Sequence, residues 1–282
     1  MRARKYTIPK PMTLREALAF LYPDSSRRTL QNWLKAGRFS INGKLAKWED
    51  ALLETGQILA SKDSCRAPKV PGLKILYEDR YLIAIEKPAG LLSVPLDEEG
   101  NRSNALSRLQ EGLQTPSIFA VHRIDRDVSG VLIFARGKES EERLKALFEK
   151  HNLHRQYFAI VEGRMKKESG TWKNRLAELS NYDVVPSPDG RDATTHFKVL
   201  RRSAKYTYLQ VLLETGRKHQ IRVHCQMAGH PVVGDIRYGA IENPIRRICL
   251  HAVHLELRHP FTGRHLAFNS SLPSSFKILG AF

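Results

Sequence analysis

Two prolines and a glycine fall within one short polar stretch, "SKDSCRAPKVPGLK", which spans residues 61–74 of this 282-residue chain. Because proline cannot continue a helix or a central strand, such a stretch is typical of a linker. The chain is also longer than a usual single domain. The sequence therefore predicts two domains, residues 1–66 and residues 67–282.

Positive charge dominates the chain. It has 46 Lys and Arg against 29 Asp and Glu, a formal net charge of +17. Residues 1–66 hold thirteen basic and six acidic residues, so the smaller part carries +7 and is the more densely charged. Lys and Arg that neutralise phosphates release condensed counterions, and an excess of this size favours a nucleic-acid partner first and an anionic membrane surface second.

Targeting and redox signals are weak. No apolar run approaches the roughly 18–20 residues that span a bilayer, and the basic start "MRARKYTIPKPM" lacks the apolar segment of a signal peptide. The cysteines, Cys65, Cys225 and Cys249, are odd in number and far apart, which favours neither a disulfide framework nor a metal knuckle. We expect a cytoplasmic protein without a membrane partner, and nothing in the sequence implies an obligatory protein partner.

The smaller part is predicted to contain two helices and a hairpin. "TLREALAFLY" opens with a capping box of Thr13 and Glu16. "SSRRTLQNWLKAG" has apolar residues at helical spacing and Gly37 in place to end the helix. "RFSINGKLA" predicts a hairpin around Asn42 and Gly43, and "GQILA" a further strand.

The second of these helices has a basic face. Arg28 and Lys35 lie on it with Arg27 beside them, and most such faces are simply solvated. The pattern with "RRTLQNWLKAGRFSINGK" at its centre resembles the S4 RNA-binding domain over about residues 12–62. That resemblance implies that the helix and hairpin lie along RNA phosphates, with Arg27, Arg28 and Lys35 as contacts.

The larger part is rich in predicted strands. The alternation of apolar and polar residues indicates strands in "LKILYED", "RYLIAIEKP", "RQYFAIVEG", "THFKVL" and "YTYLQVLLET". "SEERLKALFEK" predicts a helix that buries Leu144, Leu147 and Phe148, and "HQIRVHCQMAG" a short helix closed by Gly229. Because strands do not alternate regularly with helices, the fold class is α+β rather than doubly wound.

Four stretches carry a second and more specific resemblance. "YLIAIEKPAGLLSVP", "HRIDRDVSGVLIFAR", "QYFAIVEG" and "TGRKHQIRVHCQMAGHPVVGD" resemble the RluA-type pseudouridine synthases over roughly residues 72–270. The resemblance implies a mixed, mainly antiparallel sheet with a central RNA-binding cleft. It also implies isomerisation of uridine to its C-glycoside, in which the N1–C1′ bond breaks and C1′ joins C5.

The same resemblance implies the site residues. Asp125 of "HRIDRDVSG" is the catalytic carboxylate, which can attack C1′ or C6 or stabilise positive charge on the sugar. Arg222 is its partner arginine, since a cation nearby favours the ionised acid. Tyr157 stacks on the target base and assists proton removal. The alternatives without a catalytic role are a surface acid for Asp125, a phosphate contact for Arg222 and core packing for Tyr157.

RNA-contacting residues are expected around this centre. The target nucleotide must leave its helix to react, and His122 and Arg123 could fill the vacated space or hold the displaced backbone. Arg217 and Lys218 of "TGRKHQ" are expected to meet phosphates, with a solvated turn as the alternative. The sequence differs from the family's common motif residues at Asp127-Val128 and at Arg155, and neither difference falls on Asp125, Tyr157 or Arg222.

No metal or cofactor is expected. His219, His224, Cys225 and His230 lack zinc-site spacing, and the cationic Lys218 and Arg222 among them would repel a metal ion. No Rossmann, P-loop or complete kinase pattern is present, and the isomerisation is redox-neutral. The preferred substrate is large-subunit ribosomal RNA, with a transfer RNA second. A non-catalytic RNA chaperone or ribosome assembly factor is the alternative from another class.

Overall fold

The computed structural model describes residues 4–22, 25, 27–61, 70–95, 104–150 and 153–280. Contacts divide the chain into two compact units, Met1–Lys69 with Glu78–Leu82 and Val70–Tyr77 with Ile83–Phe282, called the smaller and the larger unit below. The expected boundary at residue 66 and most of the expected linker lie outside the described residues, so the domain limits stay a prediction. No helix in the described ranges is both long and apolar enough to cross a bilayer.

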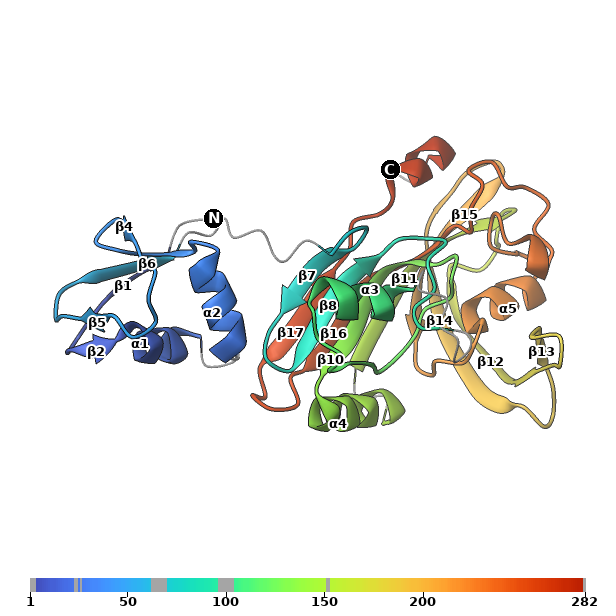
Figure 1. Ribbon diagram of the computed structural model, residues 1–282. Coiled ribbons are helices and arrows are strands. Elements are labelled where there is room, and N and C mark those ends of the chain that lie inside the picture. Colours follow the sequence, from blue (N-terminus) through green and yellow to red (C-terminus); the bar gives the residue numbers. More distant parts are fainter. Residues whose placement is uncertain are drawn as a thin grey trace. The chain divides into compact units, whose positions relative to one another are not determined.

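The smaller unit is built on two small sheets and two helices (Figure 1). A four-stranded sheet has the order β1-β6-β3-β4, and β2 pairs with β5. The elements are β1 (Arg4–Thr7), β2 (Met12–Thr13), α1 (Leu14–Leu21), α2 (Arg27–Lys35), β3 (Phe39–Ile41), β4 (Lys44–Leu45), β5 (Leu52–Leu53) and β6 (Ile58–Ser61).

Local sequence signals explain these elements. The Thr13 hydroxyl accepts the Glu16 backbone N–H at the start of α1, and the Glu16 carboxylate accepts the Thr13 N–H at 2.7 Å, which confirms the predicted capping box. Asn42 and Gly43 both have positive φ, as a tight hairpin turn between β3 and β4 requires. The core includes Leu14, Leu18, Leu30, Leu34 and Phe39, which gives α2 a buried face opposite its basic one.

The larger unit is dominated by one eleven-stranded sheet. Its order is β13-β12-β14-β15-β11-β16-β10-β8-β7, with β17 on β16 and β9 on β10. The strands are β7 (Lys74–Glu78), β8 (Leu82–Lys87), β9 (Ile118–Ala120), β10 (Ser129–Arg136), β11 (Leu153–Glu162), β12 (Ser169–Glu178), β13 (Val184–Pro186), β14 (Arg191–Arg202), β15 (Tyr206–Leu213), β16 (Leu250–Arg258) and β17 (His265–Asn269).

Pairing within this sheet is mixed and mainly antiparallel, which confirms the predicted fold class. β10 runs parallel to β16, whereas β11 runs antiparallel to both β15 and β16, and β14 antiparallel to β12 and β15. β10 is buried along nearly its whole length. A strand covered on both faces needs a continuous apolar run, and "GVLIFA" supplies it.

Helices cover parts of this sheet (Figure 1). They are α3 (Ala105–Gly112), α4 (Lys138–Glu149), α5 (Gln220–Met227) and the 3-10 turns η1 (Ile236–Tyr238) and η2 (Ser274–Leu279). α5 packs beside β13 and β14 and is followed by Gly229 with φ +73°, as predicted. On α4 only part of the prediction is confirmed, because Leu144 is buried whereas Leu147 and Phe148 are half-buried.

Candidate active site

Asp125 lies in the loop between β9 and β10, and a second segment fixes that loop from behind. The Ser93 hydroxyl donates to the carbonyl of Ile124 at 2.7 Å and accepts the Ile124 N–H at 3.2 Å. The Gly90 N–H donates to the carbonyl of Arg126 at 2.8 Å. "KPAGLLS" and "HRIDRDVSG", which are more than 30 residues apart, therefore form one rigid support under Asp125.

Lys87 anchors this support. Its side chain is fully buried, and Nζ donates to the carbonyls of Pro88, Leu91 and Arg126 at 2.6–3.0 Å. Burial lowers the pKa of Lys87 to about 7, while the nearby carboxylate of Asp125 opposes that decrease. Three acceptors match the three N–H bonds of an ammonium group, which favours the charged form. The sequence analysis assigned no role to Lys87.

We expect Lys87→Met to destabilise the protein. The replacement keeps the length of the side chain but leaves three carbonyls without their donor, so the free energy of unfolding should fall by about 1–3 kcal/mol. Urea denaturation checks this. The matched control is Lys74→Met, because Lys74 is exposed and pairs with Glu86 at 3.0 Å. Loss of that surface pair should cost less than about 1 kcal/mol, and equal stability of both variants would contradict the anchoring role.

Ser129 and Gly130, the last two residues of "HRIDRDVSG", connect the Asp125 loop to the sheet. Gly130 has φ +117°, and a Cβ there would lie 2.1 Å from the carbonyl oxygen of Ala252 on β16. Only glycine permits so close an approach of the two backbones. The Ser129 hydroxyl lies 2.7 Å from His251 Nδ1 and accepts a hydrogen bond from Arg247. Both residues hold the start of β10 against β16.

Arg222 projects from α5 and joins two carboxylates. Its Nη1 lies 3.2 Å from Asp125 Oδ2, while Nε and Nη2 donate to the two oxygens of Asp235 at 2.6 and 2.8 Å. Arg222 is 5% exposed and Asp235 is 1% exposed. The Asp235 and Asp125 carboxylates raise the pKa of Arg222 above its ordinary value despite burial. The guanidinium is thus fixed by Asp235 and presents its remaining edge to Asp125.

His219 stands at the start of α5 and approaches the same oxygen of Asp125 as Arg222 does. Its Nε2 is 3.9 Å from Asp125 Oδ2, and its Nδ1 is 2.7 Å from the Tyr238 hydroxyl. That hydroxyl already accepts the Val184 N–H, so its own proton is free to bond Nδ1. Burial lowers the pKa of His219 to about 4, and the neutral ring therefore directs Nε2–H toward Asp125.

Tyr157 comes from β11 and lines the same cleft as Asp125, a hollow of about 480 Å³. Burial raises the pKa of Tyr157 to about 12, although the Arg155 cation opposes the increase. Among the described residues its hydroxyl has no hydrogen-bond partner. Arg155 is itself buried, donates to the Glu214 carbonyl at 3.2 Å and fits beside Gly216, where a Cβ would clash with it. The cleft thus brings together the carboxyl group of Asp125, buried arginine side chains and the neutral phenol of Tyr157.

The comparisons with known proteins agree with this geometry. A family model described as RNA pseudouridylate synthase matches residues 81–227. The "Ribosomal large subunit pseudouridine synthase D" of Xanthomonas campestris is 34% identical over 286 residues, covering 93% of this chain and 86% of that protein. The chain belongs to the RNA pseudouridylate synthase family. It is accordingly an isomerase that converts uridine to pseudouridine.

Two further matches extend the comparison. The "Uncharacterized RNA pseudouridine synthase YhcT" of Bacillus subtilis is 31% identical over 90% of this chain and 88% of that protein. The solved structure of "Human RNA Pseudouridylate Synthase Domain Containing 1" has a TM-score of 0.60 at 22% identity and covers 73% of this chain and 86% of the human one. At that identity the human structure supports the fold alone.

His122 and Arg123 both line the cleft of this pseudouridine synthase, but in different ways. His122 Nε2 accepts the backbone N–H of Ile133 at 2.9 Å, and the ring stacks on Phe148 with centroids 4.3 Å apart. Burial lowers the pKa of His122 to about 3, so the ring is neutral and anchors the loop to β10. Arg123 is exposed and lines a second hollow as well.

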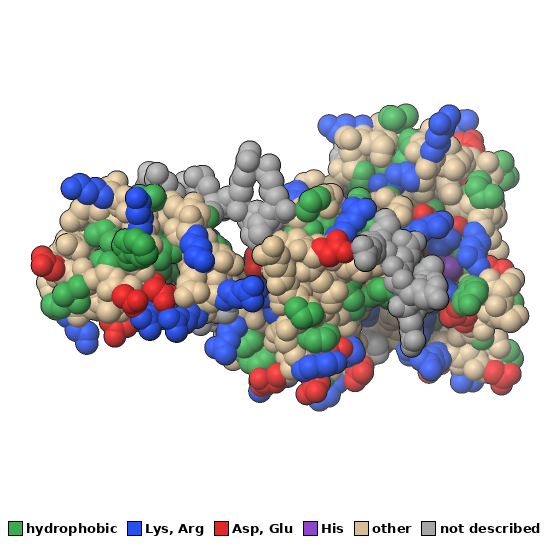
Figure 2. Space-filling view, in the orientation of Figure 1, with side chains coloured by type: hydrophobic (Ala, Val, Ile, Leu, Met, Phe, Trp, Pro, Cys, Tyr) green, Lys and Arg blue, Asp and Glu red, His purple; other side chains and the backbone are tan. Residues whose placement is uncertain are grey.

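The second hollow, of about 900 Å³, adjoins the first at Asp125 and is bordered by cations. Figure 2 shows several Lys and Arg side chains on the visible face of the larger unit. Lys218 lines it and is paired with Glu178, whereas Arg217 lines the first cleft and donates to the Asp192 carbonyl at 3.0 Å. The second hollow is also lined by four arginines that were not predicted as RNA contacts from the sequence: Arg126, Arg237, Arg246 and Arg247.

The remaining predicted RNA contacts belong to the smaller unit. Arg27, Arg28 and Lys35 are all exposed on α2. Arg27 donates to Glu49 at 2.7 Å, and this contact raises the pKa of Arg27. The structure therefore brings the predicted cleft residues together around Asp125 and leaves these three on a separate body.

Proposed function

We propose that this chain isomerises uridines of large-subunit ribosomal RNA in the cytoplasm, with Asp125 as the reacting carboxylate. The observation that carries the proposal is the geometry of Arg222, which Asp235 holds rigidly with one guanidinium edge 3.2 Å from Asp125. Several relatives of this chain are named ribosomal large subunit pseudouridine synthases, which supports the choice of substrate.

The carboxylate suits the chemistry of this reaction. The N1–C1′ bond of uridine must break, C1′ must bond to C5, and the C5 proton must leave. An ionised Asp125 can form a bond to C1′ or to C6, or stabilise positive charge at the sugar. Only 19% of its side chain is exposed, so a bound nucleotide would exclude most water from it and strengthen each of these interactions.

Tyr157 is proposed to stack on the target base. An aromatic face provides about 1–3 kcal/mol of stacking with a nucleobase. With a pKa near 12 the phenol is neutral at physiological pH, and a neutral phenol cannot accept the C5 proton. This favours the stacking role over direct proton removal.

The surroundings support extrusion of the target nucleotide. Unstacking costs a few kcal/mol, which contacts to the displaced strand must offset. Arg123 is exposed between the two hollows and is proposed to contact the vacated position or the flanking phosphate. His122 is proposed to hold this loop, with its neutral ring edge toward RNA. Arg217 and Lys218 are proposed as phosphate contacts, joined by the further cations of the second hollow.

Purified enzyme and unmodified transcripts test the substrate. Large-subunit ribosomal RNA, small-subunit ribosomal RNA and bulk transfer RNA would be incubated separately, and pseudouridine would be mapped at single-nucleotide resolution. We expect conversion at defined positions of the large-subunit RNA. Conversion in transfer RNA alone would overturn the substrate assignment but not the activity. Tight RNA binding without any conversion would leave a chaperone or assembly role in its place.

The smaller unit is proposed to bind RNA as an S4-like domain through α2. Its net charge, its exposed Arg27, Arg28 and Lys35, and the hairpin that follows α2 support this assignment. Each phosphate contact contributes about 0.7–0.9 to the slope of log affinity against log salt concentration. Because Arg27 is paired with Glu49 in the free protein, Arg28 and Lys35 should contribute most.

Replacing Arg27, Arg28 and Lys35 by Gln should therefore flatten the salt dependence. We expect the slope to decrease by about 1.4–1.8 from two contacts, and by a smaller further amount from Arg27. Turnover of a short, saturating RNA should remain near that of the wild type. Filter binding between low and moderate salt measures the slope.

The control removes the same charge from cations that are already paired. Lys74, Lys138 and Arg143 each contact a glutamate of the larger unit. Their replacement by Gln should change the slope little. A slope that responds equally to both triple variants would mean that only net charge matters, and that α2 does not bind the RNA.

A further inference from the structure

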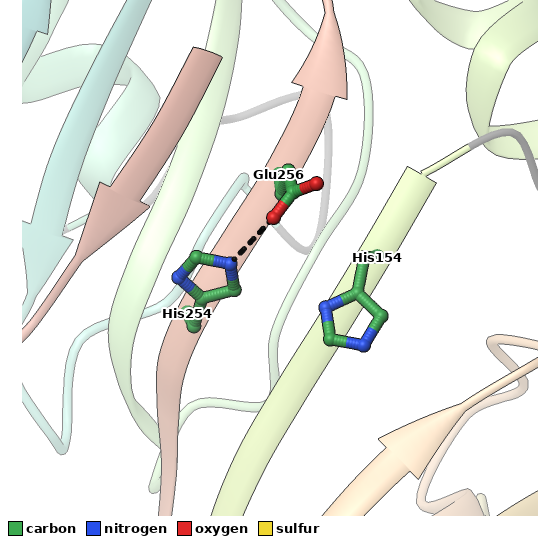
Figure 3. A group of neighbouring side chains, drawn as sticks. All are labelled: His154, His254 and Glu256. Carbon is green, nitrogen blue, oxygen red and sulfur yellow. Dashed lines mark hydrogen bonds and ion pairs between the residues drawn. The ribbon is translucent and has the colours of Figure 1, made fainter. Parts of the chain in front are cut away.

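Two histidines and a glutamate converge on neighbouring strands of the large sheet. His154 on β11 is paired in register with Glu256 on β16, and His254 lies two residues before Glu256 on the same face of the strand. Figure 3 shows the three side chains pointing toward one another from the two strands. The imidazole nitrogens and carboxylate oxygens that could bind a metal lie within 4.8 Å of one another.

Hydrogen bonds fix how these groups face each other. His254 Nδ1 is 2.8 Å from Asn269 Oδ1 on β17, and His254 Nε2 is 3.2 Å from Glu256 Oε2. An amide oxygen only accepts, so the proton of a neutral His254 lies on Nδ1. Nε2 then presents a lone pair to a carboxylate oxygen. The two atoms are 3.2 Å apart, a separation at which one metal ion can be bound by both.

Further contacts orient the Glu256 carboxylate and leave the site open to a metal ion. His265 Nε2 is 2.5 Å from Glu256 Oε1, so the carboxylate is held from its other side. His154, His254 and Asn269 also line a hollow of about 530 Å³ that is open to solvent and gives a metal ion access.

We propose that His154, His254 and Glu256 form a zinc site. Two imidazoles and one carboxylate are a ligand set that Zn²⁺ accepts, with a water as the fourth ligand. Asn269 accepts a hydrogen bond from His254 Nδ1 and so leaves Nε2 of the same ring available to bind the metal ion. The site takes no part in the catalytic reaction. A bound metal ion would link β11 to β16 next to the irregularity in their pairing at Gln156 and Tyr157. It would thereby stabilise the strand that carries Tyr157.

Zinc titration of the full-length, tag-free protein after chelator treatment tests the proposal. Competition with a chromogenic chelator should show one Zn²⁺ bound per chain. His254→Ala and Glu256→Gln should each weaken binding tenfold or more. Co²⁺ should give the visible absorption of a four-coordinate site in the wild type but not in these two variants. Glu256→Gln keeps size and shape, so its thermal unfolding in the absence of metal should stay near that of the wild type.

His196→Ala is the matched control. His196 Nε2 lies 3.1 Å from Glu214, and its Nδ1 lies 2.9 Å from the Thr171 hydroxyl, which reproduces a histidine–carboxylate pair without the second imidazole. Zinc affinity of this variant should equal that of the wild type. No saturable binding in the wild type, or equal affinity in His254→Ala, would overturn the proposal.

Discussion

Asp125→Asn is expected to lower the rate of pseudouridine formation by at least about a thousandfold. The amide has nearly the same size as the carboxylate and can still accept a hydrogen bond from Arg222, but it lacks the negative charge and the nucleophilic oxygen. RNA affinity should change little, because the cations that line the two hollows are untouched. Tritium release from RNA labelled at uridine C5, under single-turnover conditions, measures the reaction.

Asp127→Asn is the matched control for this variant. Asp127 lies two residues further along the same loop and pairs with Arg126 at 3.2 Å, with its side chain more exposed than that of Asp125. Its replacement should leave tritium release near the wild-type rate. If both variants lose activity equally, catalysis depends on the total negative charge of the loop and not on contact between Asp125 and the nucleotide.

Arg222→Met is expected to have the second largest effect and to change two properties at once. Asp235 would be left buried and without the partner that donates to both its oxygens, so the free energy of unfolding should fall by about 3–5 kcal/mol. Asp125 would lose its cation, so turnover should fall strongly as well. Urea denaturation and single-turnover kinetics measure the two effects separately.

A double variant separates stability from chemistry. Arg222→Met combined with Asp235→Leu removes both buried charges, and such replacements of a buried pair by apolar residues are often neutral or stabilising. We expect the double variant to recover most of the stability and none of the turnover. Recovery of turnover together with stability would mean that Arg222 acts only by holding the fold.

Features set by neighbouring residues could be predicted from the sequence. The capping box of Thr13 and Glu16 and the Asn42-Gly43 turn depend on residues a few positions apart, and both are present. The α+β class followed from the strand-like periodicity. Leu147 and Phe148 were predicted to be buried with Leu144. Both are instead half-buried, and Phe148 lines the cleft, where its ring stacks on His122.

The residues that support the site were harder to find. Asp235 and Lys87 both lie in stretches that carried the family resemblance, yet their roles depend on contacts 13 to 39 residues away. A charged residue directly after an apolar strand, as in "LIAIEK", was the available signal for Lys87. His219 was considered only as a metal ligand, and its place beside Asp125 depends on the folded loop, in which it has a left-handed φ of +53°.

The histidine–glutamate cluster shows a further limit. His154 and Glu256 lie about a hundred positions apart, and only the register between β11 and β16 brings them together. The irregularity in that pairing at Gln156 and Tyr157 shifts the register, and no periodicity reveals such a shift. The sequence analysis weighed only the histidines around α5 as metal ligands.

One measurement tests the central claim most directly. Pseudouridine would be mapped in the ribosomal RNA of cells that lack this gene and carry either the wild-type chain, Asp125→Asn or Asp127→Asn on a plasmid at equal protein levels. We predict that particular uridines of the large subunit lose modification in the deletion strain and regain it with the wild type and Asp127→Asn, but not with Asp125→Asn. Full modification by Asp125→Asn would contradict the account.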